Sequence, residues 1–404
     1  MSQAGMTPAE SIEEQEHARD DGDKKPKTRR PANTAFRQQR LKAWQPILTP
    51  KSVLPLFFIV GVIFAPIGGV LLWASSLVQE ISIDYSECSR LAPTNTDAAV
   101  PHYSATFKSS QSISAPTWRK TNNSGTITCS LVFEIPNELP APVFMYYRLT
   151  NFYQNHRRYV ASLDLNQLKG DAVSYDTIKG GTCDPLATNS TAKKVYYPCG
   201  LIANSFFNDT IGQPQIRDPN ETDNEEKFYE MTKKGIAWES DKELIKQTKY
   251  KIDEILPPPN WIWAGKDGVY KEVPNLHENE DFMVWMRTAG LPSFSKLSRR
   301  NDTHAMPAGT YAIDIVDNFN VTEYAGTKSI LISTRTALGG KNSFMGIAYI
   351  VVGGICVLLG ALFTVAHLVR PRKLGDHTYL TWDSNQPSTA VATGRDDRFG
   401  SSAP

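Results

Sequence analysis

The chain has 404 residues, which is enough for roughly two or three ordinary domains. Its 43 basic and 42 acidic residues leave a formal net charge of +1. It therefore lacks the strongly basic balance that is typical of nucleic-acid-binding proteins, and we expect no nucleic-acid partner. The mean hydropathy is mildly polar, at −0.35, but this average conceals two long apolar blocks.

The N-terminal tail, residues 1–52, is expected to lie in the cytoplasm. Residues 1 to about 30 are polar and charged, and they hold too few apolar side chains to fold. The stretch from Lys24 to Lys51 carries nine basic residues and no acid, as is typical of the cytoplasmic flank of a membrane helix. These basic residues could also adhere to an anionic leaflet, and the sequence leaves both interpretations open.

Each apolar block is long enough to cross a bilayer. Residues 52–79 and 342–369 include no Asp, Glu, Lys or Arg, and roughly 20 apolar residues span a hydrocarbon core of about 30 Å. We therefore predict transmembrane helices at residues 53–78 and 344–369. The alternative is a pair of buried core helices, which rarely run this far without a charge. The first block lacks a small-residue cleavage pattern and begins far along the chain, so we interpret it as a retained signal anchor.

Charges beside the two blocks predict the orientation. Acidic residues follow the first block, whereas Arg370, Arg372 and Lys373 follow the second, and basic residues collect on the cytoplasmic side of a membrane helix. Both termini are therefore predicted to be cytoplasmic, with residues 79–343 outside the cytoplasm. The C-terminal tail, residues 370–404, is polar and is expected to be disordered over most of its length.

The region 79–343 carries two further signs of an extracytoplasmic compartment. It holds four of the five cysteines of the chain, namely Cys88, Cys129, Cys183 and Cys199. An even set of this kind indicates two disulfide bonds, for which three pairings are open. The region also holds the glycosylation sequons, which begin at Asn122, Asn189, Asn208, Asn220, Asn301 and Asn320. Neither tail contains a sequon.

The same region is predicted to be strand-rich. Apolar and polar residues alternate over 127–135, which is the period of a strand with one buried face. Three prolines then break the chain before a second extended run at 143–149, so we expect these two strands to be antiparallel neighbours. Further strands are predicted at 311–316 and 328–334, and short helices within 222–256. The predicted fold class is a membrane protein with two transmembrane helices and a large extracytoplasmic, mainly antiparallel-β (α+β) domain.

Small residues recur every seven positions in both apolar blocks. The series are Gly346, Gly353 and Gly360 in the second block and Gly61, Gly68 and Ser75 in the first. A seven-residue step returns to nearly the same face of a helix, and a smooth face lets membrane helices approach closely. We predict that these faces bind a helix of another protein. The alternatives are that the two helices pack only on each other, or that glycine is simply common in membrane helices.

No catalytic machinery is recognisable in the sequence. The region 79–343 has no H-E-x-x-H or C-x-x-C zinc spacing and no G-x-S-x-G nucleophile elbow. Residues 325–329 mimic the end of a phosphate loop but lack its required glycine, and no D-K-T-G phosphorylation sequence exists. Carboxylate pairs cannot be judged from spacing, which leaves glycosidase-type chemistry open. We predict no cofactor, no metal and no enzymatic activity.

The densest local feature is the run Asn-Phe-Tyr-Gln-Asn-His-Arg-Arg-Tyr at 151–159, directly after a predicted strand. Aromatic and arginine side chains are favoured at protein interfaces. The candidates for partner binding are therefore Asn151, Phe152, Tyr153, Arg157 and Arg158. The alternative is an internal hydrogen-bonded corner, with both arginines paired to nearby acids.

Several segments in order carry a resemblance to a known family. They are residues 30–46 before the first block, 151–159, 197–210 and 281–288 in the middle region, and 339–342 and 372–376 around the second block. Together they resemble the cell-cycle control protein fifty family, the accessory subunits of phospholipid flippases. The resemblance runs from about residue 30 to 382, and it departs at Gly290, where alanine is expected.

The resemblance implies a non-catalytic β subunit of a type IV P-type ATPase. Such a subunit forms a heterodimer with the ATPase in the phospholipid bilayer, helps it fold and leave the endoplasmic reticulum, and supports phospholipid transport toward the cytoplasmic leaflet. It implies disulfides that join Cys88 to Cys129 and Cys183 to Cys199. It also places residues 30–46 against the ATPase, through Arg30, Asn33, Phe36, Gln39, Arg40 and Trp44. The expected location is the endoplasmic reticulum, the Golgi or endosomes, or the plasma membrane.

Two other classes of function are alternatives. Some ligand-gated channel subunits also have two helices and a disulfide-bonded outer domain, but they need polar pore-lining positions, which these glycine-striped blocks scarcely offer. An ectoenzyme would require turnover by the isolated outer domain.

Overall fold

The computed structural model describes residues 33–41, 49–109, 113–217, 227–261, 268–336 and 339–371. The chain divides into two units, Met1–Leu56 with Phe363–Pro404, and Phe57–Leu362. The tails that the sequence predicts to be disordered, residues 1–30 and 375–404, lie outside the described residues.

In the first unit, residues 33–41 form a compact turn. The Arg40 N–H donates to the Ala35 carbonyl oxygen at 2.7 Å, and the Arg40 guanidinium donates to the side-chain oxygen of Asn33. The Phe36 ring on this turn is 76% exposed. A large apolar ring that a turn holds in the open is available to a binding partner.

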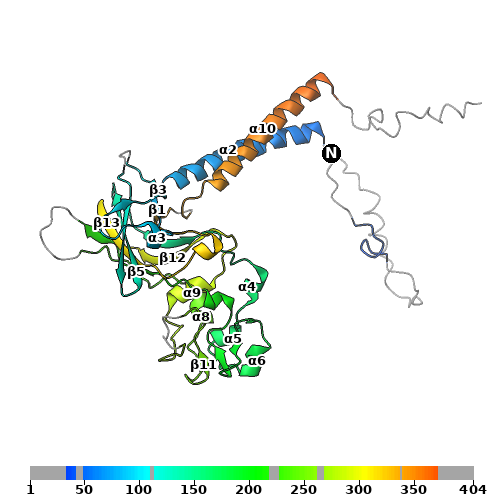
Figure 1. The fold of residues 1–404 in the computed structure, drawn as a ribbon. Coiled ribbons are helices and arrows are strands. Elements are labelled where there is room, and N and C mark those ends of the chain that lie inside the picture. Colours follow the sequence, from blue (N-terminus) through cyan, green and yellow to red (C-terminus); the bar gives the residue numbers. More distant parts are fainter. Residues whose placement is uncertain are drawn as a thin grey trace, which may run out of the picture. The chain divides into compact units, whose positions relative to one another are not determined.

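The long apolar helices are α2 (Pro50–Ser76) and α10 (Phe344–Val369), which lie side by side (Figure 1). In the most apolar window of each, 11% and 17% of the residues are buried inside the protein. The core helix of a soluble protein would be mostly buried, so the core-helix alternative does not fit. The chain is therefore an integral membrane protein.

The glycine stripes form the contact between α2 and α10. A Cβ atom added to Gly68 would lie 2.8 Å from both the Gly346 carbonyl oxygen and the Ile350 nitrogen. Without side chains at these positions the two backbones come into contact. The stripes thus face the sister helix, which is one of the alternatives that the sequence left open. Gly346, Gly353 and Gly360 belong to this helix contact, and their predicted binding to a helix of another protein stays a prediction.

In the sequence, the middle domain, residues 80–336, comes between these two helices, and it contains two large antiparallel sheets (Figure 1). The first sheet has the order β12–β6–β14–β1–β3, with strands β12 (Phe294–Asn301), β6 (Val143–Leu149), β14 (Lys328–Thr334), β1 (Glu80–Asp84) and β3 (Tyr103–Thr106). The second has the order β10–β13–β5–β4–β2, with β9 also paired to β13. Its strands are β10 (Gln215–Arg217), β13 (Gly309–Val316), β5 (Thr126–Ile135), β4 (Thr117–Asn123), β2 (Ala98–Ala99) and β9 (Thr210–Ile211).

A smaller lobe contains a third sheet, formed by β11 (Ile255–Leu256), β8 (Lys194–Tyr196) and β7 (Thr188–Asn189). The short helices of the middle domain are α3 (Cys88–Leu91), α4 (Arg157–Ala161), α5 (Leu165–Leu168), α6 (Tyr175–Lys179), α7 (Leu201–Asn204), α8 (Glu239–Leu244) and α9 (Glu280–Met286), with a 3-10 turn at Thr322–Tyr324. One buried cluster joins residues of both large sheets, and another fills the smaller lobe around Tyr197, Trp261 and Phe282.

The predicted strands at 127–135, 143–149, 311–316 and 328–334 are confirmed as β5, β6, β13 and β14. The expectation that the first two are antiparallel neighbours is wrong. β5 pairs with β4 and β13, whereas β6 pairs with β12 and β14 in the other sheet. Because proline has no N–H for a ladder, the proline-rich connection at 136–142 ends one sheet and carries the chain to the other.

Two disulfides connect segments of the middle domain. Cys88, the first residue of α3, is bonded to Cys129 in β5, and Cys183 is bonded to Cys199 in the smaller lobe. The predicted presence of disulfide bonds is confirmed, and the pairs are those that the resemblance implies. All four cysteines are buried.

The two disulfides differ in the length of the loop that they close. Replacing Cys183 and Cys199 by serine opens a loop of 16 residues, and we expect it to lower the free energy of unfolding by about 3 kcal/mol. Replacing Cys88 and Cys129 opens a loop of 41 residues, for which we expect about 4 kcal/mol because a longer loop has more entropy to lose. Urea unfolding of the purified chain, followed by tryptophan fluorescence, measures both. A larger loss from the shorter loop would contradict this account.

Candidate partner-binding surface

The corner at 151–159 begins where β6 ends. Asn151 has a φ of +56°, a conformation that asparagine tolerates better than most residues. Its side-chain amide donates to the Tyr324 carbonyl oxygen. The N–H of the preceding residue, Thr150, donates to the Thr327 carbonyl oxygen at 3.0 Å. These bonds fix the direction in which the corner leaves the sheet.

Phe152 anchors the corner in the core. Its ring packs against the rings of Trp285 (5.7 Å between centroids), Tyr324 (5.4 Å) and Tyr159 (6.0 Å, edge to face). Aromatic pairs at such separations add to the free energy of ordinary apolar burial. The partly buried Phe152 side chain is thus a structural anchor of the corner, and its contact with a partner stays a prediction.

Gln154 ties the corner to the loop after α9. Its side chain is fully buried. Its carbonyl oxygen accepts the Ala289 N–H at 2.9 Å, and its amide donates to the Tyr159 hydroxyl at 3.3 Å. Burial raises the pKa of Tyr159 to about 12, so its hydroxyl stays protonated and bonds the Ser205 hydroxyl at 2.8 Å. Buried amides that bond in this way fix the positions of two segments relative to each other.

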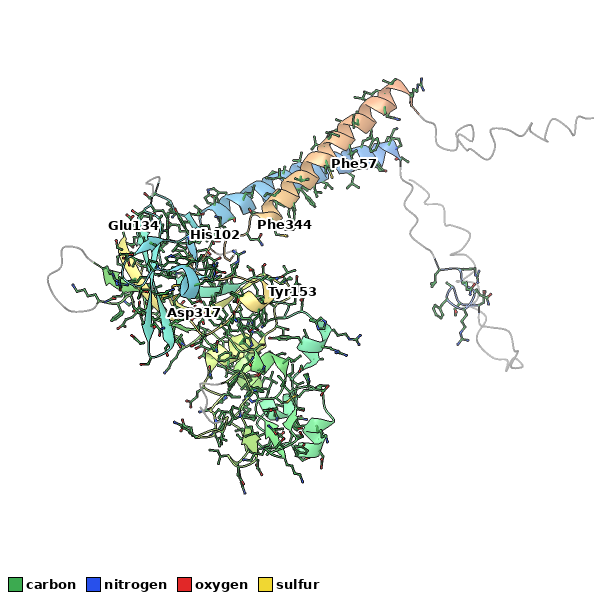
Figure 2. The ribbon with its side chains drawn as sticks, in the orientation of Figure 1. Phe57, His102, Glu134, Tyr153, Asp317 and Phe344 are labelled. Carbon is green, nitrogen blue, oxygen red and sulfur yellow. A yellow bond between two sulfur atoms is a disulfide. The ribbon has the colours of Figure 1, made fainter. Side chains whose placement is uncertain are left out.

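The outer side of this corner, where Tyr153 lies (Figure 2), presents a mixed apolar and cationic face. Tyr153 is 57% exposed and Leu291 is 70% exposed, and Asn155 holds their two segments together by donating to the Gly290 carbonyl oxygen at 3.0 Å. Arg157 and Arg158, at the start of α4, are exposed. Within the described residues neither arginine has an ion-pair partner. The segment is therefore an internal corner on one side and a free surface on the other.

We call this face the Tyr153 surface, defined as Tyr153, Arg157, Arg158, Val160 and Leu291. Exposed tyrosine and arginine side chains are favoured at protein-binding sites, and exposed apolar side chains beside them enlarge the contact area. The departure from the family pattern at Gly290 does not disturb it, because a Cβ atom added there would meet open space.

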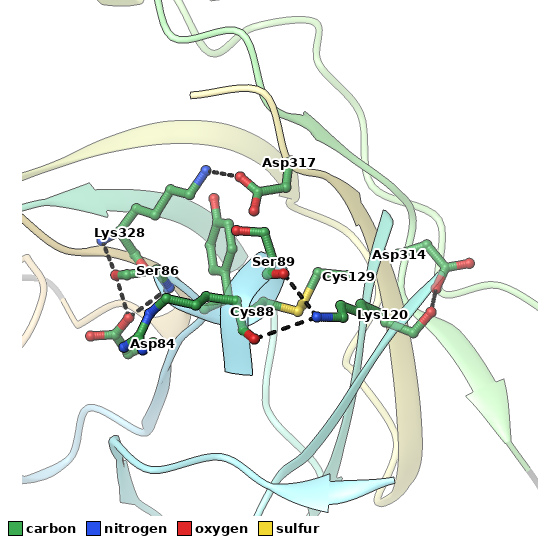
Figure 3. The surroundings of a disulfide bond; sticks show 12 residues. Asp84, Ser86, Cys88, Ser89, Lys120, Cys129, Asp314, Asp317 and Lys328 are labelled. Atoms are coloured by element: carbon green, nitrogen blue, oxygen red, sulfur yellow. Dashed lines mark hydrogen bonds and ion pairs between the residues drawn. A yellow bond between two sulfur atoms is a disulfide. The ribbon is translucent and has the colours of Figure 1, made fainter. Parts of the chain in front are cut away.

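A buried ionic cluster, which was not predicted from the sequence, connects segments of the two large sheets. Lys328 is 1% exposed, and its ammonium group donates to Asp317, as Figure 3 shows. It also donates to Asp209 and to the Phe319 carbonyl oxygen, both at 2.7 Å. The Tyr85 hydroxyl donates to Asp209 at 3.0 Å. Burial raises the pKa of Asp209, and the charge of Lys328 opposes that rise. The cluster joins segments that are far apart in the sequence.

Lys328 could have been identified from its position in the strand. It is in phase with Ile330 and Ile332, which are both 1% exposed, and side chains two residues apart share a face of a strand. A lysine on a buried face requires carboxylate partners, but the sequence offered no way to select Asp209 and Asp317.

A second buried lysine supports the loop at 287–292. The Lys296 ammonium group donates to the carbonyl oxygens of Trp285 and Arg287, both at 2.6 Å, at the end of α9. Burial, assisted by the nearby charge of Arg287, lowers the pKa of Lys296 to about 7. This lysine caps the end of α9, whose last carbonyl groups lack partners within the helix.

The lowered pKa of Lys296 predicts a pH dependence of stability. Between pH 7 and the ordinary lysine pKa, the unfolded chain binds a proton that the folded chain does not, so the free energy of unfolding rises with pH. The slope is at most about 1.4 kcal/mol per pH unit. Urea unfolding from pH 6.5 to 9 should show this rise in the native chain and a smaller one in Lys296→Met. Equal slopes in the two proteins would exclude Lys296 as the cause.

Comparison with known families decides where this chain belongs. A model described as LEM3 (ligand-effect modulator 3) family / CDC50 family matches residues 71–373, well over half of the chain. The chain belongs to the LEM3/CDC50 family. The matched region contains the Tyr153 surface, both disulfides, the ionic cluster and all of α10.

Relatives of this LEM3/CDC50 chain are similar over nearly its whole length. The phospholipid-transporting ATPase accessory subunit CRF1 of Saccharomyces cerevisiae is 42% identical, with 89% of this chain and 90% of the relative covered. The phospholipid-transporting ATPase accessory subunit CDC50 of Chaetomium thermophilum is also 42% identical, with 89% and 92% covered. Cell cycle control protein 50A of Mus musculus is 41% identical, with 84% and 89% covered.

The remaining predicted site residues of this LEM3/CDC50 chain fall into two groups. Arg30, Trp44 and Asn220 lie outside the described residues. Among the described sequons, the side-chain oxygens of Asn189, Asn301 and Asn320 each accept the N–H of the sequon threonine at 3.0 Å, which forms a local turn. Asn122 and Asn320 are exposed, while Asn189, Asn208 and Asn301 are partly exposed. Their glycosylation stays a prediction.

Proposed function

We propose that this chain is the non-catalytic accessory subunit of a type IV P-type ATPase that moves phospholipid toward the cytoplasmic leaflet. The observation that carries the proposal is the similarity, over about nine tenths of both chains, to proteins named phospholipid-transporting ATPase accessory subunits. We further propose that it helps the ATPase to fold and to leave the endoplasmic reticulum. The exposed Tyr153 surface, whose two arginines have no ion pair with any residue that the structure describes, supports a role in assembly.

The proposed topology assigns a compartment to each part of the chain. Residues 1–52 and 370–404 are cytoplasmic, helices 53–78 and 344–369 cross the membrane, and residues 79–343 form the glycosylated outer domain. Two buried disulfides support an oxidising compartment for that domain. The complex resides in the endoplasmic reticulum, the Golgi or endosomes, or the plasma membrane.

Two regions are proposed to contact the ATPase. On the outer side, the Tyr153 surface binds an extracytoplasmic loop that carries acidic residues, because Arg157 and Arg158 have no internal ion pair within the described chain. On the cytoplasmic side, residues 30–46 contact the ATPase, and the 76% exposed ring of Phe36 supplies an apolar anchor.

Co-purification tests the proposed function directly. The full chain, tagged at one terminus and extracted in mild detergent, should carry an equimolar large subunit that mass spectrometry identifies as a P-type ATPase. Recovery of the chain as a homotrimer without a large subunit would overturn the proposal and favour a channel.

Charge reversal tests the Tyr153 surface. In Arg157→Glu with Arg158→Glu, we expect the co-purified ATPase to fall at least about tenfold, because like charges then face the acidic loop. The matched control, Lys234→Glu with Lys271→Glu, makes the same change in charge at two other exposed positions and should leave the yield unchanged. Equal losses in both variants would show that net charge, and not this surface, matters.

A further inference from the structure

A groove lies where α2 ends and α10 begins. Its volume is about 380 Å³, within the range of small-molecule sites. The residues that line it and matter here are Ile67, Leu71, Ser75, Asn342, Met345 and Tyr349. It therefore combines side chains of both membrane helices with the segment that leads into α10.

One end of this groove is polar and offers hydrogen-bond donors. Ser75 is 8% exposed, and its oxygen accepts the Asn342 N–H at 3.0 Å. Its own O–H has no acceptor within the described chain. The Asn342 side-chain oxygen accepts the Phe344 N–H at 3.0 Å, which leaves the side-chain NH₂ of Asn342 without a partner in the same described residues. A buried hydroxyl that lacks an acceptor is costly unless a bound molecule supplies one.

The start of α10 adds to this polar end. The first N–H groups of a helix have no partner within it and carry a partial positive charge, so phosphate binds readily there. Lys341 contributes little net charge, because its ammonium group donates to Thr106 at 2.7 Å and lies 3.6 Å from Glu80. The attraction for an anionic group thus comes from the helix end, Ser75 and Asn342.

The other end of the groove is apolar and open to the surroundings of the helices. Ile67 is 42% exposed and Met345 is 48% exposed, while the Tyr349 ring packs on Phe64 with centroids 5.1 Å apart. From Ile67 to Ser75 the helix rises about 12 Å. A bilayer leaflet has the same sequence of a polar layer and an apolar layer, because its headgroups lie at the surface and its acyl chains lie beneath them.

We propose that this groove binds one phospholipid of the adjacent leaflet, which is the extracytoplasmic leaflet in the proposed topology. Its phosphate and ester oxygens accept from Ser75, Asn342 and the start of α10, and one acyl chain lies along Ile67, Leu71 and Tyr349. A helix of another protein fits less well, because its backbone carbonyl groups are already bonded within the helix. A phospholipid supplies both the acceptors and the apolar chain.

Photo-crosslinking in native membranes tests this site. The probe is a phosphatidylcholine that carries a diazirine and an alkyne on one acyl chain, and the full chain is purified after irradiation and mapped by peptide mass spectrometry. We expect labels to concentrate on residues 67–75 and 342–349. Labels spread evenly over the exposed apolar faces of both helices would overturn the proposal, since this is the pattern of ordinary surrounding lipid.

A pair of substitutions on α2 distinguishes lipid bound in the groove from lipid that only surrounds the helices. Ile67→Trp fills the groove and should lower labelling of residues 342–349 about tenfold. Val70→Trp adds the same ring at a position that is 59% exposed and does not line the groove, and it should leave the labelling unchanged. Intact disulfides and a single sizing peak show that both variants fold. Equal labelling in the two variants would exclude the site, whether or not the ATPase co-purifies.

Discussion

Lys328→Met should be among the most damaging single substitutions in the middle domain. It leaves the carboxylates of Asp209 and Asp317 buried, with exposures of 0% and 9%, and without their shared cation. Removing one partner of a buried ion pair costs about 3–5 kcal/mol, which is a large part of the stability of an ordinary domain. Urea unfolding of the purified chain measures the loss, and retention of the protein in the endoplasmic reticulum is the expected cellular result.

A lysine at the surface supplies the control for this substitution. Lys233 lies 2.6 Å from Asp281 but is 48% exposed, so we expect Lys233→Met to cost no more than about 1 kcal/mol. Adding Asp209→Asn and Asp317→Asn to Lys328→Met removes the uncompensated charges and should restore part of the stability. If Lys328→Met and Lys233→Met destabilise equally, burial of the cluster is not the cause.

Gly68→Leu should separate the two membrane helices. The added side chain would meet backbone atoms of α10, with its Cβ 2.8 Å from Gly346 and Ile350, and backbone cannot move aside as a side chain can. We expect the variant to lose most of the co-purified ATPase and to elute as a broad peak in detergent. The same measurements on Gly353→Leu, on the facing side of the contact, should give a similar loss.

The neighbouring glycines make this test specific. Gly69 and Gly354 each follow a contact glycine, and a Cβ atom added to either meets nothing within 4 Å. Gly69→Leu and Gly354→Leu should therefore leave the helix pair intact. If Gly354→Leu alone abolishes co-purification, then the face of α10 that points away from α2 binds the ATPase. A normal result for Gly68→Leu would mean that the two helices do not pack through their stripes.

Local patterns predicted much of this fold. The absence of charge over 52–79 and 342–369 identified both membrane helices, and period-two alternation identified β5, because both signals depend only on neighbouring residues. The pairing of strands depends on distant residues, which explains why β5 and β6 were wrongly expected to be neighbours. The cysteines indicated disulfides from their number alone, while their pairing came from the family resemblance.

The sequence predicted where the candidate surface lies but not which of its side chains are exposed. The composition of 151–159 suggested both a corner and an interface, and no sequence pattern shows that Gln154 points inward while Tyr153 points outward. That division depends on the loop at 289–292, which lies more than a hundred residues further along the chain. The sequence also did not determine whether the glycine stripes contact the sister helix or another protein, because a small residue does not specify which helix packs against it.

The order of strands in the first sheet constrains synthesis of the protein. β14 is the last strand to be translated, yet it lies between β6 and β1, and it pairs with both along their full lengths. Until the ribosome has passed Thr334, the edges of β6 and β1 that face β14 have no partner, and unpaired edges invite aggregation. A nascent chain of this protein must therefore be shielded from aggregation until its second membrane helix is about to emerge. Premature stop codons between β1 and β14 should yield products that are degraded faster than the full-length chain.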